Sequence, residues 1–266
     1  MRLFLILLFL ISPMVSASAG SSDWFRTEGA KIRLIALPSP QGTHINAGLQ
    51  IELEKGWKTY WRSPGASGLP PQLDFAGSKN IASTALRFPV PTTFGDGKNL
   101  TAGYTTSVTL PITIEPLFPN RAVTINTTGI LGICEEICVP VQFRLSLAED
   151  GTGVSTADVA RALFQSTSNL VSAQRDDLKI EAAKYAERKL LVRARVPMSA
   201  TKAALMVEGP SDWYLTPAKA RKVENGTALF EVNFSDIPQD ADPTKIPLTF
   251  TLVSHGDGVE QKITPQ

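Results

Sequence analysis

Short alternating runs of apolar and polar residues, separated by glycine and proline, dominate this chain. Glycine and proline each occur 19 times among the 266 residues. Such runs are typical of β-strands, because successive side chains of a strand point to opposite faces of its sheet. Examples lie at residues 32–37, 45–53 and 228–234. The pattern therefore predicts an all-β protein.

The strand signals fall into two groups. The first lies within residues 23–147, and the second begins near residue 177. Between them, residues 149–153 form a charged, glycine-containing break. The segment that follows, Ser155-Thr156-Ala157-Asp158, resembles a helix capping box with Asp in place of the usual Glu. We therefore expect one clear helix, from Thr156 to about Ser168, between the two groups.

The length allows two domains of roughly 125 residues or one large sandwich. The second group alone has roughly six or seven strand signals, which suits an immunoglobulin-like sandwich. We therefore predict two tandem immunoglobulin-like β-sandwich domains joined by a short helical linker. The predicted bounds are 20–150 for the first domain, 151–172 for the linker and 173–266 for the second domain.

The first 19 residues have the features of a secretory signal peptide. A positive start, Met1-Arg2, precedes an apolar run over residues 3–11 and the small residues Ala17-Ser18-Ala19. The run is about half of the roughly 20 residues that span a bilayer, so an uncleaved anchor is the weaker alternative. We expect cleavage after Ala19 and an exported protein that does not itself span the membrane. A periplasm is the expected location, where disulfides persist.

The charge of the chain is nearly balanced. Lysine and arginine total 26, aspartate and glutamate total 25, and the net charge is +1. There is no basic stripe of the kind that binds nucleic acid. No phosphate-binding loop or Ser-His-Asp order stands out, and we expect no bound cofactor.

Both cysteines of the chain, Cys134 and Cys138, lie within a five-residue window, between two strand signals. A structural disulfide there would close so short a loop that it stabilises the fold by only about 2 kcal/mol. A reversible dithiol fits better, because close spacing lets the second thiol resolve a mixed disulfide. A metal site is poorly supplied, since His44 and His255 are the only histidines. Three functions stay open: disulfide exchange, a binding or scaffold protein with a structural disulfide, and copper handling by the two thiolates.

Two carboxylates, Glu135 and Glu136, separate the cysteines. Negative charge disfavours a thiolate. We therefore expect ordinary or raised thiol pKa values, and exchange that proceeds well only inside a docked complex.

Four motifs together carry a family resemblance. They are Gly56-Trp57-Lys58-Thr59-Tyr60-Trp61-Arg62-Ser63-Pro64-Gly65 with Gly68-Leu69-Pro70-Pro71, then Phe88-Pro89-Val90-Pro91, Gly103-Tyr104, and the Cys-x-x-x-Cys-Val-Pro element at Cys134. Over about residues 24–147 the chain resembles the amino-terminal periplasmic domain of the DsbD thiol–disulfide interchange family. It most resembles the copper-sensitivity suppressor (ScsB) branch, which has two tandem immunoglobulin-like folds.

The resemblance implies an electron relay, with the activity of a protein-disulfide reductase. In the family this domain receives electrons from a membrane-embedded domain by way of a thioredoxin-like domain. It then reduces periplasmic partners such as disulfide isomerases. The second cysteine of the motif, here Cys138, would attack the partner disulfide, and Cys134 would resolve the intermediate. A short aromatic cap loop would cover the pair, and Phe94 and Gly95 match its position best.

Family members usually continue into a multi-span membrane domain and a thioredoxin-like domain. The 266 residues include neither. Either the protein is a stand-alone relay that receives electrons from a separate membrane-embedded donor, which is the expected partner, or it keeps the fold for another use.

Overall fold

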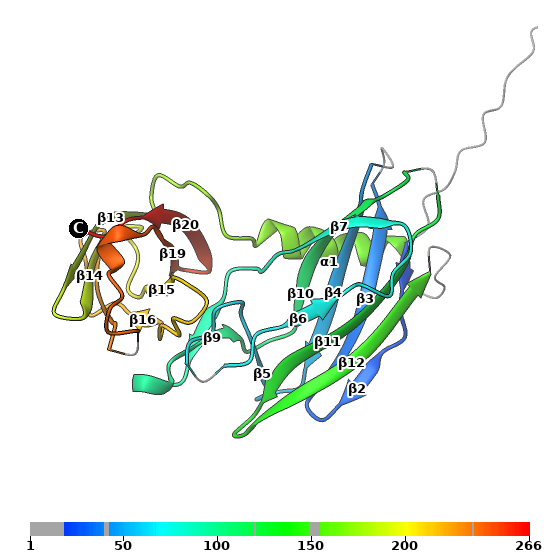
Figure 1. The fold of residues 1–266 in the computed structure, drawn as a ribbon, viewed down its shortest axis with the longest axis horizontal. Helices are drawn as coiled ribbons and strands as arrows, with labels where there is room; N and C mark the ends of the chain where they lie inside the picture. The colour runs from blue at the N-terminus through cyan, green and yellow to red at the C-terminus, as the bar shows by residue number, and fades with distance from the viewer. Residues whose placement is uncertain (1–18, 40–42, 67, 120, 149–154, 236) are drawn as a thin grey trace, which may run out of the picture.

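The computed structural model of the chain describes residues 19–39, 43–66, 68–119, 121–148, 155–235 and 237–266. Two β-sandwiches lie beside each other, and the one α-helix of these described ranges lies along the first (Figure 1). The all-β, immunoglobulin-like two-domain fold that the sequence predicts is therefore confirmed. The predicted signal peptide, residues 1–19, lies outside the described residues except for Ala19.

The first sandwich has two antiparallel sheets of six strands each. In one sheet the order is β1-β3-β4-β10-β7, and β2 also pairs with β3. Its strands are β1 (Gly20–Ser21), β2 (Phe25–Thr27), β3 (Ala30–Pro38), β4 (Ile45–Leu53), β7 (Ile81–Leu86) and β10 (Val108–Pro116).

In the other sheet the order is β12-β11-β5-β9-β8, and β6 also pairs with β11. Its strands are β5 (Lys58–Tyr60), β6 (Gln72–Asp74), β8 (Thr92–Phe94), β9 (Thr101–Tyr104), β11 (Thr124–Cys134) and β12 (Cys138–Ala148), and a short 3-10 helix, η1 (Gly97–Asn99), follows β8. Inward-facing residues of both sheets form one core, in which Trp61 is fully buried. This second sheet carries both cysteines.

The second sandwich has two antiparallel sheets of four strands, ordered β13-β14-β18-β17 and β16-β15-β19-β20. Its elements are β13 (Lys179–Ala186), β14 (Lys189–Arg195), β15 (Ala204–Glu208), β16 (Ala218–Lys219), β17 (Lys222–Glu224), β18 (Thr227–Asn233), the 3-10 helix η2 (Pro243–Lys245), β19 (Leu248–Ser254) and β20 (Asp257–Ile263). Asn225 and Gly226 have φ angles of 49° and 73°. These values fit the two-residue hairpin turn that an Asn-Gly pair favours. A separate apolar core, which includes Phe230 and Phe250, fills this sandwich.

Helix α1 (Thr156–Ser168) has the bounds that the sequence predicts. Ser155 is its N-cap, but the Ser155 side chain makes no capping hydrogen bond, so the predicted capping box is wrong in that detail. Val159 and Leu163 are buried and pack with Ala19 and Ile35. Neighbouring residues of β3 face the main core, so α1 covers the opposite face of that sheet. The helix is therefore packed on the first sandwich along its length.

The two sandwiches contact each other directly. Met206 of β15 belongs to the core of the first sandwich. The backbone after α1 also forms hydrogen bonds with both sandwiches. Asn169 O accepts from Val90 N of the first sandwich at 2.8 Å, and Ser172 N donates to Gly258 O of the second at 2.9 Å. No helix among the described residues has both the length and the apolar character needed to cross a bilayer.

Candidate dithiol–disulfide site

The two cysteines lie at the tip of a long hairpin. Strands β11 and β12 pair without a break from Thr124 opposite Ala148 to Cys134 opposite Cys138. The two cysteines form a disulfide, and their Cα atoms are 4.2 Å apart. Three intervening residues form the hairpin loop and place the cysteines directly across the ladder. The spacing seen in the sequence is thus the spacing of one cross-strand pair.

The two halves of the disulfide differ in exposure. Cys134 is only 3% exposed, whereas Cys138 is an exposed residue. The loop residues between them are exposed too, and Ile137 is 78% exposed. An incoming thiol or disulfide therefore meets Cys138 first.

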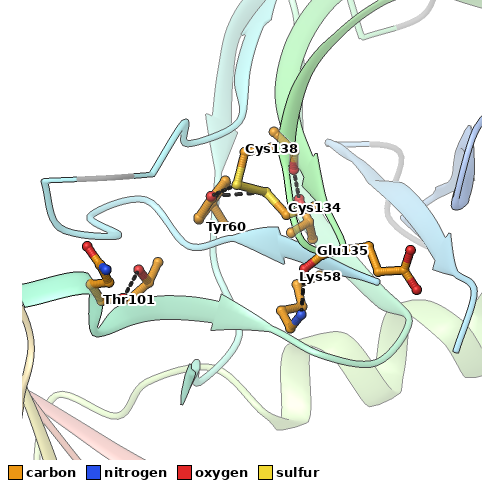
Figure 2. Close-up of a disulfide and its surroundings, with 9 residues drawn as sticks. Lys58, Tyr60, Thr101, Cys134, Glu135 and Cys138 are labelled. Carbon is orange, nitrogen blue, oxygen red and sulfur yellow. Dashed lines mark hydrogen bonds between the residues drawn. A yellow bond between two sulfur atoms is a disulfide. The ribbon is translucent and has the colours of Figure 1, made fainter. Parts of the chain in front are cut away.

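The phenol of Tyr60 lies against both sulfurs (Figure 2). Its Oη atom is 2.6 Å from Cys138 Sγ and 3.0 Å from Cys134 Sγ. Sulfurs of a disulfide carry no hydrogen, so the phenol is the donor in this contact. Burial raises the pKa of Tyr60, which keeps the phenol protonated and able to donate.

Strand pairing puts Tyr60 in this position. Strand β5 pairs with β11 at Thr59–Ile133 and Lys58–Cys134, next to the disulfide. The Tyr60 ring then packs over Gly132, where a Cβ atom would lie 2.5 Å from Tyr60 Cε2. Only glycine leaves room for the ring at that position.

A cation lies beside the hairpin loop. Lys58 Nζ donates to the backbone carbonyl of Glu135 at 3.0 Å, as Figure 2 shows. Glu135 and Glu136 are both exposed. The negative charge of the two loop carboxylates disfavours a thiolate, as the sequence predicts. The nearby Lys58 ammonium group offsets part of this effect.

The predicted cap residues lie at the end of β8. The Phe94 and Tyr60 ring centroids are 6.2 Å apart, with the rings tilted by 38°. Phe94 is half-buried and joins the site through the Tyr60 ring. Gly95 is exposed and has a φ of 76°, and a Cβ there would lie 2.5 Å from Asn99 O. Gly95 therefore allows the sharp turn from β8 into η1.

Sequence reasoning quoted Tyr60 and Lys58 in a motif but gave neither a role at the cysteines. Tyr60 lies on β5, which has only three residues. So short a strand shows no alternation in the sequence, and no other sequence signal links Tyr60 to the cysteines. The two histidines lie elsewhere: His44 precedes β4, and His255 lies in the turn between β19 and β20. Within the described ranges, no group of three or more His, Cys, Asp or Glu side chains could hold a metal ion.

The first sandwich matches a known family model, and the whole fold matches a solved structure. Residues 29–150 match the family model described as thiol:disulfide interchange protein DsbD, N-terminal. The structure is similar to the crystal structure of the N-terminal periplasmic domain of ScsB from Proteus mirabilis, with a TM-score of 0.79 and 19% sequence identity. That similarity covers 93% of this chain and 99% of the other. No curated protein matches the chain.

Proposed function

Because residues 29–150 form an amino-terminal domain of the DsbD thiol–disulfide interchange family, we propose that this protein relays electrons to disulfide-bonded partners through Cys134 and Cys138. Its activity would be that of a protein-disulfide reductase in the periplasm. The observation that carries the proposal is the disulfide itself: it lies at an exposed hairpin tip, with one cysteine buried, one exposed, and a phenol against both sulfurs.

The exposure of the two cysteines supports separate roles. In the reduced protein, the Cys138 thiolate attacks one sulfur of the partner disulfide. The partner S–S bond breaks, its second sulfur leaves as a thiolate and takes up a proton, and a mixed disulfide forms at Cys138. The Cys134 thiolate then attacks Cys138 Sγ, which releases the partner as a dithiol and restores the Cys134–Cys138 disulfide. Two electrons pass to the partner in each cycle.

Tyr60 supports this chemistry at both sulfurs. A neutral phenol donates more strongly to a sulfur anion than to a neutral sulfur, because hydrogen bonds to charged acceptors are the stronger ones. Its O–H therefore favours the Cys138 thiolate before attack. It also favours the Cys134 thiolate as that sulfur is regenerated during re-reduction.

The surface beside Cys138 suits a protein partner. Ile137 is 78% exposed and Val139 is 50% exposed, one on each side of Cys138. Exposed apolar side chains around a reactive atom are typical of docking surfaces. The partner we propose is a periplasmic thioredoxin-fold protein or disulfide isomerase, and the electrons would come from a separate membrane-embedded donor.

A purely structural role explains the disulfide less well. Eleven consecutive residue pairs already fix the β11–β12 register. The disulfide closes a five-residue loop, which contributes only about 2 kcal/mol in the chain-entropy account. The hairpin therefore has little need of a covalent bond at its tip.

Trapping the mixed disulfide tests the proposal. A Cys134→Ala variant keeps the attacking thiol and lacks the resolving thiol. It should form a lasting mixed disulfide with an oxidised periplasmic thioredoxin-fold protein, detected by mass and reversed by reductant. The matched Cys138→Ala variant keeps only the buried thiol and should form far less adduct. Absence of an adduct with both variants would refute the relay.

A further inference from the structure

The second sandwich contacts the first through Arg62, which follows Tyr60 by two residues. Arg62 Nη2 lies 2.6 Å from Glu208 Oε1, and Arg62 Nε lies 3.0 Å from Glu208 Oε2. Arg62 Nη2 also forms an ion pair with Glu260. The three side chains are 29%, 23% and 34% exposed, so water screens these contacts only in part. We call this three-residue cluster the Arg62 clamp.

A second contact joins the two sandwiches next to the cap. Lys219 Nζ of β16 donates to the backbone carbonyl of Gly95 at 3.4 Å. The residues just before β16 lie against the loop after β5, because a Cβ at Gly65 would lie 3.0 Å from Pro217 Cδ. The second sandwich therefore touches both segments that surround the Tyr60 ring.

The segment after β5 contacts the second sandwich at Arg62 and the cysteine strand β11 at Leu69. The Arg62 guanidinium lies 4.2 Å from the centroid of the buried Trp61 ring, and Trp61 N donates to Ala102 O at 3.1 Å. Farther along, Leu69 O accepts from Gly132 N at 3.1 Å, two residues before Cys134. A shift of Arg62 would therefore move a segment bonded to the cysteine strand.

We propose that Arg62 is a positioning residue, through which the second domain holds Tyr60 against the disulfide and Phe94 against the Tyr60 ring. The second domain would thereby set how readily a small thiol reaches the Cys134–Cys138 bond. This inference rests on the proposed exchange function and assigns a role to the second domain. Burial lowers the pKa of Arg62, but hydrogen bonds and charge from Glu208 and Glu260 outweigh that effect and raise it, so the clamp stays charged.

Replacing the clamp carboxylates with amides tests the inference from a distance. Glu208→Gln with Glu260→Gln keeps both side-chain shapes and removes the charge that holds Arg62. Both positions are in the second domain, so an effect on the disulfide must pass through the interface. With the full chain and dithiothreitol as the probe thiol, the reduction rate should rise roughly three- to tenfold, as expected for loss of a partly screened ion-pair cluster. Alkylation followed by mass measurement reports the two cysteines directly.

The control is a carboxylate of the same domain whose ion-pair partners both lie within that domain. Glu231 pairs with Lys189 and Arg221, and all three residues belong to the second sandwich. Glu231→Gln should leave the reduction rate unchanged. Lys219→Ala removes the contact to Gly95 at an exposed site and should raise the rate by a smaller factor than the double variant.

The outcomes separate this inference from the proposed function. An unchanged or slower rate in the double variant, with a disulfide that still equilibrates with glutathione, would overturn the inference alone. Failure of the unmodified disulfide to exchange with a glutathione buffer would overturn the proposed function. An equal increase in Glu231→Gln would show a general loss of stability and would also overturn the inference.

Discussion

At the scale of single residues, Tyr60 joins the chemistry of the site to its packing. Its hydroxyl contacts both sulfurs, and its ring contacts Phe94. Cys134 and Cys138 could be found from the sequence because they are the only cysteines and lie close together. Tyr60 could not, because 74 positions separate it from Cys134 and only the β5–β11 pairing joins them.

Replacing Tyr60 with Phe tests the role of the phenol. The substitution removes one hydrogen bond to the sulfur anion and keeps the ring contact with Phe94. Alkylation of Cys138 at neutral pH should slow by about threefold, because less thiolate is present and its greater nucleophilicity compensates only in part. The measurement is the iodoacetamide rate against pH in the reduced protein. Tyr214→Phe, at a 64% exposed position of the second sandwich, is the control and should have no effect. An unchanged profile for Tyr60→Phe would contradict the assigned role.

The pKa of Tyr104 predicts how stability depends on pH. Burial raises this pKa well above its ordinary value of 10.0, although the charge of Arg62 lowers it in part. The folded state therefore holds the proton more tightly than the unfolded state. This contribution is fully present below about pH 10 and is lost as the pH rises through the folded-state pKa.

Urea unfolding between about pH 8 and about pH 11 tests the direction of this pH dependence. The range brackets the ordinary tyrosine pKa of about 10. The unmodified protein should lose stability above about pH 10 more steeply than Tyr104→Phe does. At neutral pH the variant should be less stable by about 1 kcal/mol, because the Tyr104 hydroxyl donates to Pro89 O at 2.9 Å. Equal slopes for both proteins would contradict the prediction.

At the scale of elements, the length of a strand decides whether the sequence can predict it. Long strands such as β4 and β14 have enough residues for the alternation to show, and the sequence located them closely. Strands β5, β8 and β9 have three or four residues each and show no alternation. These three strands place Tyr60 and the predicted cap beside the disulfide. The sequence could therefore predict the hairpin strands but not the short strands that complete the site.

Helix α1 offers a test of packing at this scale. Leu163 is 6% exposed, and its Cδ2 atom would lie 3.1 Å from a Cβ built on Gly48 of β4. Leu163→Ala should lower the free energy of unfolding of the first sandwich by about 2–4 kcal/mol through the cavity it leaves. The neighbouring Phe164 is 71% exposed. Phe164→Ala should therefore change the free energy of unfolding by less than about 0.5 kcal/mol.

Urea titration followed by tryptophan fluorescence measures both variants. Three of the four tryptophans, Trp24, Trp57 and Trp61, lie in the first sandwich and report its unfolding. Equal loss in the two variants would show that α1 is not packed through the Leu163 face.

At the scale of the whole molecule, the two sandwiches share an interface that includes Met206 of β15 and the Arg62 clamp. The sequence predicted the two-domain fold from the spacing of strand signals and the break near residue 150. It could not predict the interface, because Arg62 and Glu208 are 146 positions apart and no local pattern pairs them. The domain bounds 20–150, 151–172 and 173–266 stay predictions, and limited proteolysis of the full chain would test them.

The reduction potential of the Cys134–Cys138 pair tests the central claim most directly. It is measured by equilibrating the full chain in glutathione buffers of set potential, alkylating the free thiols and reading the mass shift of the two cysteines. A relay disulfide should have a potential between about −270 and −120 mV, the range of known exchange proteins. A potential below about −300 mV would mark an inert structural bond and would contradict the relay.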